Sequence, residues 1–492
     1  MKKLLLCLLV PASLAHAQSV PSVSLQAGAV IALPAGAAPS ALALADFNQD
    51  FRRDRDIAVC QRGLGSVAVY LQTSGGNFPN PAAGTYAAGL RPSGLVVVPL
   101  GRAPARPSID LLAISGPSSS YTLLTNNNDG TGTFTPVAGP ARNTYFGFGN
   151  LSLNPQLLAR DLDNNGLVDF VFTYDSQTFT IASNGIYRQE LLNSTTVDTP
   201  YKEYFQTFYT PASLALDDFD RDGALDLVTT NANGHEFTVA FSDNPGQPGP
   251  CWRCAFSSRR QAQPSLGLRP VHVATADVNR DQLPDLALAH EGSSEVTLLL
   301  NLRNYQFGAA ASYPLSGAPR KVALRDLNND LYPELLVLTA DNRLQVFQHT
   351  GSTGVSRYGT PLTLATGADP VTMELDDMNG DGLTDVVVGC AGDNTVRVFL
   401  NRSGVVSAAR APQLAGVSVS PNPATDRVTI QRPTSLTGPL TAVLLDALGR
   451  EVRQVAVLAP AGTLSVAGLP QGVYVLRLSA PAGVSSQRLV VE

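Results

Sequence analysis

Short acidic loops recur along the chain with a spacing that suits cation binding. The complete form is D-x-[DN]-x-[DN]-G-x-x-D, in which side-chain oxygens at positions 1, 3 and 5 fall on one side of a tight turn and the carboxylate at position 9 returns to the same point. Calcium prefers roughly six to eight oxygen ligands, and position 6 favours glycine because the turn is sharp. Two copies have every element of this pattern: Asp218, Asp220, Asp222 and Asp226, and Asp377, Asn379, Asp381 and Asp385.

Four further copies are present. One is nearly as good and keeps the glycine at 166: Asp161, Asp163, Asn165 and Asp169. Two more keep four oxygen-bearing residues: Asp277, Asn279, Asp281 and Asp285; and Asp326, Asn328, Asp330 and Glu334. Gln282 and Leu331 stand where glycine is preferred, and Glu334 is a longer final acid. The least complete copy has an insertion before its final acid: Asp46, Asn48, Asp50 and Asp56.

These acidic sets predict structural calcium ions in several loops. An EF-hand is excluded, because position 12 is Phe172, Thr229 or Val388 where that motif needs glutamate, and the flanking segments are predicted strands, not helices. The alternative is that the Asp and Asn side chains only form hydrogen-bonded turns between strands. Bound calcium would rigidify the loops, which carry no evidence of catalysis.

The loops belong to a repeat that covers most of the chain. Its copies begin at positions 46, 100, 161, 218, 277, 326 and 377, and the copy at 100 has lost its acids. Apolar segments with period-2 alternation flank each loop and predict strands. A proline precedes the first acid by seven residues in five copies: Pro39, Pro211, Pro270, Pro319 and Pro370.

The length of the repeat predicts the fold. About 55 residues per copy suits one four-stranded antiparallel sheet, and seven such sheets packed radially form a β-propeller. A strand within residues 22–26 or 30–33 could complete the last sheet and close the ring. We therefore expect an all-β chain, with a seven-bladed β-propeller over residues 18–402, a linker over 403–415 and a small Ig-like β-sandwich over 416–492.

The repeats resemble the FG-GAP/VCBS repeats of integrin-α-like seven-bladed propellers. Three segments carry the resemblance, which extends over residues 30–401: Asp-Phe-Asp-Arg-Asp-Gly-Ala-Leu-Asp-Leu at 218–227, Asp-Met-Asn-Gly-Asp-Gly-Leu-Thr-Asp-Val at 377–386, and Asn-Asp-Gly-Thr-Gly-Thr-Phe at 128–134. The resemblance implies calcium in the loops and recognition of extracellular glycans or proteins. Fewer than seven ions are expected, because one copy lacks the acids.

The C-terminal module lacks the acidic repeat. Seven short strands are expected, at residues 417–420, 428–430, 441–445, 452–457, 463–466, 473–478 and 487–491, which is typical of a β-sandwich. The module resembles the type A C-terminal sorting domain of type IX secretion in Ser-Pro-Asn-Pro at 420–423 and in residues 445–452 and 469–476. The resemblance implies that residues 416–492 engage the secretion machinery. The alternative is an ordinary Ig-like accessory domain.

The N-terminus predicts export. Lys2 and Lys3 precede an apolar stretch over residues 4–10, and Ala15-His16-Ala17 forms a small-x-small cleavage site, so residues 1–17 are expected to be a signal peptide. No other apolar run approaches the roughly 20 residues of a transmembrane helix. The expected location is secreted or attached to the outer-membrane surface of a Gram-negative bacterium.

Composition narrows the partners. The formal net charge is −6 and the arginines are scattered, so no basic surface for nucleic acid is expected. Cys251 and Cys254 form a lone C-x-x-C, expected to be a small loop disulfide or two idle thiols, whereas Cys60 and Cys390 are expected in the core.

The sequence favours a binding protein over an enzyme. It has no H-E-x-x-H, no G-x-S-x-G and no phosphate-binding glycine loop between a strand and a helix. We expect a monomeric, exported, calcium-binding propeller that recognises a glycan or protein in adhesion or capture. The alternative is an extracellular polysaccharide-active enzyme, a hydrolase or lyase, built on the propeller.

Overall fold

The chain divides into two units, Met1–Gly404 and Val405–Glu492. A computed structural model describes these residues: 22–50, 54–73, 76–79, 82–98, 109–115, 120–137, 156–160, 168–174, 184–190, 203–207, 211–242, 259–303, 306–351, 357–403, 417–433, 436, 440–445, 451–457, 460–480 and 483–491. The predicted signal peptide, most of the predicted linker, and Cys251 and Cys254 lie outside them. In the described part of the chain, no helix is long and apolar enough to cross a membrane.

The described residues of the first unit form seven four-stranded antiparallel sheets. In sheet order they are β2 (Pro39–Ala45), β3 (Asp56–Gln61), β4 (Ser66–Tyr70) and β5 (Gly84–Ala87); β6 (Pro92–Val98), β7 (Asp110–Ser115), β8 (Ser120–Asn126) and β9 (Phe134–Pro136); β10 (Leu157–Arg160), β11 (Asp169–Tyr174), β12 (Asn184–Glu190) and β13 (Glu203–Thr207); β14 (Pro211–Asp217), β15 (Asp226–Asn231), β16 (Glu236–Phe241) and β17 (Arg259–Pro264); β18 (Pro270–Ala276), β19 (Asp285–His290), β20 (Glu295–Asn301) and β21 (Phe307–Pro314); β22 (Pro319–Arg325), β23 (Glu334–Thr339), β24 (Arg343–Phe347) and β25 (Leu362–Ala365); and β26 (Pro370–Asp376), β27 (Asp385–Cys390), β28 (Thr395–Asn401) and β1 (Leu25–Ala32). A short 3-10 turn, η1 (Ala232–Gly234), joins β15 to β16.

The sheets follow one another in a circuit. β2 contacts both β6 and β26, and further contacts join β6 to β10, β11 to β14, β14 to β18, β18 to β22 and β22 to β26. The first strand of each repeat therefore lies innermost and the fourth outermost. The all-β propeller predicted from the repeat is confirmed.

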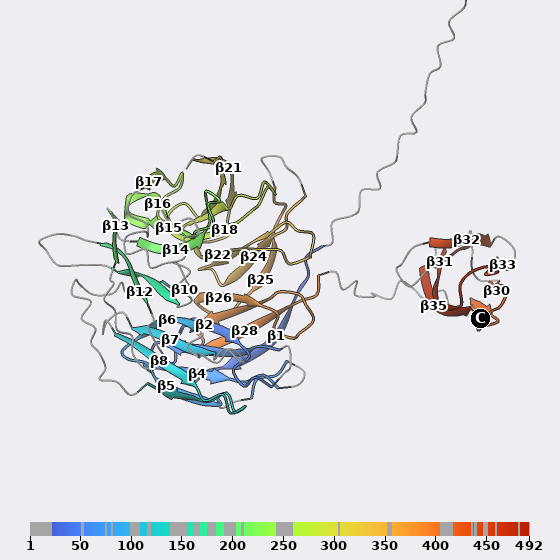
Figure 1. Cartoon of the computed structure of the whole chain (residues 1–492), viewed down its shortest axis with the longest axis horizontal. Coiled ribbons are helices and arrows are strands. Elements are labelled where there is room, and N and C mark those ends of the chain that lie inside the picture. The colour runs from blue at the N-terminus through green and yellow to red at the C-terminus, as the bar shows by residue number, and fades with distance from the viewer. Residues whose placement is uncertain are drawn as a thin grey trace, which may run out of the picture. The chain divides into compact units, whose positions relative to one another are not determined.

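The last sheet combines the two ends of the propeller sequence. β1 pairs antiparallel with β28, with Leu25 opposite Asn401 and Ala32 opposite Thr395, and Figure 1 shows the two strands side by side. The prediction that an N-terminal strand completes the last sheet is confirmed. Residues near the N-terminus thus hold the final repeat in place.

Apolar residues fill the space between neighbouring sheets. All six positions are buried in each of β3, β7, β15, β19, β23 and β27, as expected for a strand with a sheet packed on both faces. One cluster joins Ala58 and Val67 of the first sheet to Leu111 and Leu124 of the second. Cys60 and Cys390 are fully buried free thiols, as predicted.

The repeated prolines mark the start of the innermost strands. Pro39 and Pro370, for example, each begin such a strand and are followed by a shift in the pairing register. Proline has no N–H to donate to a neighbouring strand, so it is tolerated at the first position of a strand or at a bulge. This explains why proline recurs seven residues before the acidic loop.

The second unit contains two sheets around one apolar core. One sheet holds β29 (Ser418–Ser420), β30 (Arg427–Gln431) and β33 (Ala461–Ser465), and the other holds β32 (Glu451–Val457), β31 (Leu440–Leu445), β34 (Gly472–Ala480) and β35 (Gly483–Val491). Val428, Leu444 and Leu476 are fully buried in the shared core. Strands are present at all seven predicted positions, while the Ig-like classification stays a prediction.

Candidate functional site

The acidic loops connect the first and second strands of their sheets. Residues 218–225 follow β14, 277–284 follow β18, 326–333 follow β22 and 377–384 follow β26. Asp161, Asp163, Asn165 and the side chain of Asp169 lie outside the described residues. The named residues of the other four-residue sets lie within the described part of the chain.

Each loop is folded around its first acid. Asp218 accepts the main-chain N–H of Asp222 through Oδ1 (3.1 Å) and that of Gly223 through Oδ2 (3.0 Å). Asp277, Asp326 and Asp377 accept the two equivalent N–H groups in their own loops. The first carboxylate therefore sets the shape of the turn.

The oxygens at positions 1, 3 and 5 lie close together. In the first complete copy, one carboxylate oxygen from each of Asp218, Asp220 and Asp222 lies within 4.8 Å of the others. Three hard, negatively charged oxygens at this separation fit a calcium ion. The equivalent predicted residues in the other described loops are Asp277, Asn279 and Asp281; Asp326, Asn328 and Asp330; and Asp377, Asn379 and Asp381.

The turn keeps its backbone shape without glycine. At position 6, Gly223 and Gly382 have φ of 90° and 85°, and Gln282 and Leu331 have φ of 70° and 72°. All four thus adopt the left-handed region, which costs a residue with a β-carbon more than it costs glycine. The replacements that distinguish these copies in the sequence leave the turn intact.

The carboxylate at position 9 has a structural task that the sequence did not reveal. Asp226 is fully buried and accepts the N–H of Phe219 (2.8 Å) and that of Ser242 (2.8 Å), 16 residues later. Asp385 likewise accepts N–H groups from Met378 (2.9 Å) and Asn401 (2.6 Å). The acid therefore ties the start of its loop to the end of the third strand.

The ninth acid persists where the other acids are lost. Asp110, in the copy without an acidic loop, is buried and accepts the N–H of Asn126 at 2.7 Å. This retention indicates that the acid serves the sheet independently of metal. Burial raises the pKa of five such acids. The pKa is about 6 for Asp56 and Asp385, and about 7 for Asp226, Asp285 and Glu334.

Side-chain amides join neighbouring sheets next to these acids. Four donate to the carbonyl of the second loop residue in an adjacent sheet: Gln72 to Met378 (2.7 Å), Asn126 to Phe47 (2.8 Å), Asn301 to Phe219 (2.8 Å) and Asn401 to Leu327 (2.7 Å). The main-chain N–H of each amide residue donates to the ninth acid of its own sheet. Hydrogen bonds thus run from loop to loop around part of the ring.

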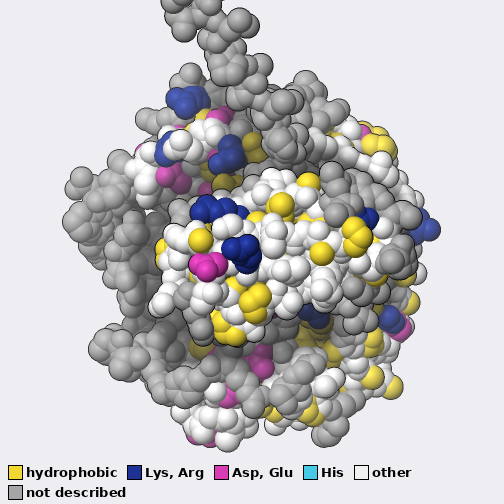
Figure 2. Space-filling view, turned by 90° about the vertical axis from the view of Figure 1, so that its right-hand side faces the viewer, with side chains coloured by type: hydrophobic (Ala, Val, Ile, Leu, Met, Phe, Trp, Pro, Cys, Tyr) yellow, Lys and Arg dark blue, Asp and Glu magenta, His cyan; other side chains and the backbone are white. Residues whose placement is uncertain are grey.

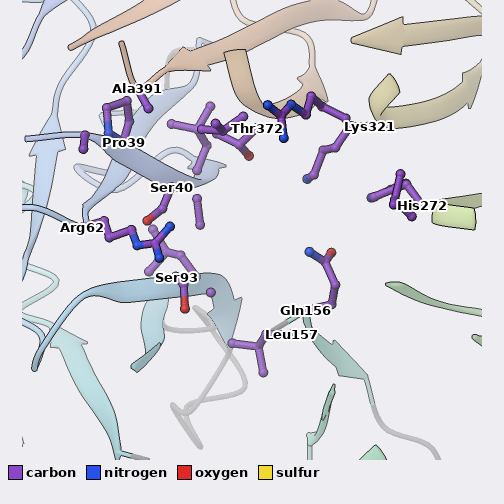
Figure 3. Close-up of a pocket in the computed structure, with 18 of the residues that line it drawn as sticks. Pro39, Ser40, Arg62, Ser93, Gln156, Leu157, His272, Lys321, Thr372 and Ala391 are labelled. Carbon is purple, nitrogen blue, oxygen red and sulfur yellow. The ribbon is translucent and has the colours of Figure 1, made fainter. Parts of the chain in front are cut away.

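A large pocket lies where the innermost strands begin, at the opposite ends of these strands from the acidic loops. Its volume is about 1080 Å³, and it is lined by residues of β2, β6, β10, β14, β18, β22 and β26, so every sheet of the first unit contributes (Figure 3). In this view, the side chains of Arg62, Gln156 and Lys321 extend into the pocket from different sides. The pocket is therefore the central opening of the ring.

Charged side chains of both signs line the pocket. Arg62, Arg91, Arg320 and Lys321 supply positive charge, and Glu291, Asp369 and Glu374 supply negative charge. Sequence analysis identified none of these residues, because they come from different copies and equivalent positions carry different residue types: Arg62 and Glu291, for example, each directly follow the second strand of their sheet. In the view of Figure 2, basic, acidic and hydrophobic side chains are interspersed among other residues.

A neutral histidine lies in the same wall. Burial, with the positive charge of Lys321, lowers the pKa of His272 to about 3. Its Nδ1 accepts the N–H of Val322 at 3.5 Å, which places the ring proton on Nε2. His272 thus adds a hydrogen-bonding group to the pocket without adding charge.

Comparisons with known families bear out both sequence resemblances. The model for the FG-GAP-like repeat matches residues 218–288, 277–337 and 326–388, and the model for the secretion system C-terminal sorting domain matches residues 418–492. The chain therefore carries FG-GAP-like repeats followed by a sorting domain. The comparison with curated proteins found no match.

Several solved structures resemble the chain at low identity. A functionally unknown protein from Desulfotomaculum acetoxidans is 10% identical, with a TM-score of 0.45 over 69% of this chain and 90% of its own. Saccharomyces cerevisiae Sqt1 is 8% identical, with a TM-score of 0.47 over 76% and 98%. The Dos1 propeller is 8% identical, with a TM-score of 0.43 over 76% and 94%.

Proposed function

We propose that this chain, which carries FG-GAP-like repeats and a secretion system C-terminal sorting domain, is an exported recognition module. The sorting domain at residues 418–492 implies contact with the secretion machinery, and secretion or attachment to the cell surface. The finer proposal is attachment to or release from the outer membrane of a Gram-negative bacterium, where the propeller binds an extracellular glycan or protein in adhesion or capture.

The observation that carries this proposal is the pocket at the centre of the ring. Binding sites are usually concave, with a few polar groups converging on the ligand. A pocket of about 1080 Å³ that all seven sheets line, six of them with charged, amide or hydroxyl side chains in or next to their strands, has these properties. The surrounding sheets form a rigid frame that would hold those groups in place for a ligand.

Calcium in the acidic loops is a second part of the proposal. The carboxylates of Asp218, Asp220 and Asp222 are the strongest candidate set, because their oxygens converge. Bound calcium would neutralise the repulsion among them and hold the loop closed. Since the loops lie at the opposite ends of the innermost strands from the pocket, the role proposed for calcium is structural.

A binding and degradation screen tests the proposed function. The full chain is applied to an array of glycans and to immobilised extracellular proteins, and the same chain is incubated with polysaccharides while new reducing ends and unsaturated products are measured. Saturable binding without product supports a recognition module. Catalytic turnover, abolished by replacing an acid in the pocket, would establish the enzyme alternative instead.

A further inference from the structure

We infer that the loop over residues 265–269 is a pH-sensitive latch at the rim of the central pocket, held closed by neutral His235 and released when that side chain is protonated. This role goes beyond the recognition function proposed above and requires no ligand.

The loop joins the fourth sheet to the fifth and lies against the turn between β15 and β16. The N–H of Ser265 donates to the carbonyl of His235 (3.0 Å), and the N–H of Arg269 donates to Nδ1 of the His235 ring (2.9 Å). The accepting Nδ1 carries no proton in this arrangement. His235 therefore holds both ends of the loop.

Two other connections between sheets make the same bond with an asparagine. The N–H of Asp369 donates to Oδ1 of Asn342 (2.9 Å), and the N–H of Ala38 donates to Oδ1 of Asn394 (2.8 Å). Each donor directly precedes the proline that begins an innermost strand, as Arg269 does, and each acceptor lies in the turn between the second and third strands of its sheet. His235 thus takes the place of an asparagine in a repeated structural bond.

The residue type at this position decides whether the bond depends on pH. His235, Asn342 and Asn394 have φ of 54°, 63° and 52°, a left-handed conformation that asparagine and histidine adopt more readily than most residues. An amide oxygen does not titrate, whereas Nδ1 of histidine accepts a hydrogen bond only while it is unprotonated. Histidine is also the side chain that ordinarily changes charge between about pH 5 and about pH 8. Because His235 is exposed, protons can reach its ring from solvent.

The closed loop has little else to stabilise it. Leu266 and Arg269 have φ of 64° and 55°, a region that is unfavourable for residues with a β-carbon. The side chains of Leu266 and Leu268 are 55% and 54% exposed, so they contribute little apolar burial. Closure therefore depends on hydrogen bonds, one of which is the bond from Arg269 to His235.

A second histidine packs under the loop but does not act as the trigger. His290 is fully buried, and a β-carbon at Gly267 would lie 2.5 Å from Cγ of its ring. Burial lowers the pKa of His290 to about 4, although Glu295 on the neighbouring strand opposes the shift. His272, on β18, has a pKa of about 3 because of its burial and the charge of Lys321. Both rings therefore stay neutral at a pH that protonates an ordinary histidine.

An ion pair joins the latch to the pocket. Nη2 of Arg269 lies 3.3 Å from Oε2 of Glu291, and the N–H of Glu291 donates to the carbonyl of Arg269 (3.0 Å). Glu291 lines the pocket. Glu236, which follows His235, accepts a hydrogen bond from Asn231 (3.2 Å). Opening of the loop would separate Arg269 from Glu291 and so change the charge at the rim of the pocket.

Hydrogen exchange of the full chain, measured by mass spectrometry at about pH 7.5 and about pH 5.5, tests the latch, because amide protection reports local opening. After correction for the intrinsic effect of pH on exchange, the protection of residues 265–269 should fall about 5-fold or more at the lower pH. Residues 366–369, whose equivalent bond is made by Asn342, should keep their protection. Global unfolding would affect both loops, so the difference between them measures the latch.

Three variants assign the effect to the residue at this position. His235→Asn is the matched variant, because it supplies an acceptor that does not titrate and suits the backbone conformation, and it should stay protected at both pH values. His235→Ala removes the acceptor and should lower the protection of residues 265–269 about 5-fold at both pH values. The converse change, Asn342→His, should make residues 366–369 sensitive to pH.

Equal protection of residues 265–269 in the wild type at the two pH values would overturn the inference. A loss in acid that persists in His235→Asn would also overturn it, because another group would then be responsible. If His235→Ala and the wild type are equally protected at about pH 7.5, the bond does not hold the loop closed and the inference is wrong. None of these results affects the recognition function, which is tested separately on the arrays.

Discussion

The side-chain amide of Gln72 donates a hydrogen bond to the main-chain carbonyl of Met378, 306 residues later in the sequence, at an N···O distance of 2.7 Å. The contact joins the first repeat to the last. At the same time, the N–H of Gln72 donates to the buried Asp56 of its own sheet (2.8 Å). One residue therefore serves both the stability of a sheet and its attachment to the next.

Replacing Gln72 with alanine should destabilise the propeller. The change removes the donor to Met378 in a buried setting, so the free energy of unfolding should fall by about 1–3 kcal/mol, measured by urea denaturation. Gln26→Ala, at an exposed position of β1, is the matched control and should change stability by less than about 0.5 kcal/mol. Equal effects of the two substitutions would contradict the proposed link.

Calcium should stabilise the chain through the acidic loops. At about 100 times the dissociation constant, one ion adds about 2.7 kcal/mol to the free energy of unfolding. Asp220→Ala should reduce the gain that calcium gives over chelator, because it removes one of three converging carboxylates. Asp129→Ala, at an exposed acid outside the loop sets, should keep the full gain. Identical melting curves in calcium and chelator would argue against these sites.

Asp110→Ala should destabilise the chain whether or not calcium is present. The substitution leaves the N–H of Asn126 without its acceptor, at an expected cost of about 1–3 kcal/mol. Since this copy of the repeat has lost its other acids, chelator and calcium should give the same loss. A loss that appears only in calcium would show that Asp110 acts through a metal ion.

Exchanging residues at position 6 of the loops should change stability in opposite directions. Leu331 is exposed and has φ of 72°, so Leu331→Gly should relieve strain and stabilise the protein by up to about 1 kcal/mol in the absence of metal. Gly382, with φ of 85°, should lose about 1–2 kcal/mol when changed to leucine. Chemical denaturation measures both, and effects of the same sign would contradict this explanation.

His290 should make the propeller less stable in acid. Burial lowers its pKa to about 4, and neither ring nitrogen has a hydrogen-bond partner among the described residues. Because the unfolded chain has the higher pKa of about 6.5, it binds the proton first, and stability is lost as the pH falls from about 6.5 towards 4.

At pH 5 the free energy of unfolding should be lower by about 2 kcal/mol because of His290. This loss is measured as the difference between wild type and His290→Leu in how the free energy of unfolding changes with pH. The subtraction is needed because the buried ninth acids have raised pKa values and act in the opposite direction. Profiles that run parallel from pH 7 to pH 5 would exclude a contribution from His290.

Much of the architecture could be predicted because it is encoded locally. The proline, the alternating strand and the acidic loop recur at short fixed spacings, so the strands assigned in one copy predict those of the next. The pairing of an N-terminal strand with the last sheet was also predictable, because the final repeat, which contains Asp385, lacks a fourth strand of its own.

The remaining features depend on contacts between strands or sheets that lie apart in the sequence. The ninth acid was expected only as a metal ligand, because its partner N–H lies 16 residues away at the end of another strand, as with Asp226 and Ser242. The amide of Asn301 meets Phe219 only after two sheets have packed. Arg62 and Arg91, which both line the pocket, occupy non-equivalent positions in two copies, so the repeat pattern does not predict that they line the same pocket.

The pairing of β1 with β28 also sets the order in which the propeller can be completed. Leu25 cannot find Asn401 until nearly the whole propeller sequence has been synthesised, so the last sheet is the final one that can assemble. Contacts between such distant residues carry a loop-closure cost and slow folding. A chain interrupted before its final repeat would leave β1 as an exposed strand edge, the kind of surface that promotes aggregation.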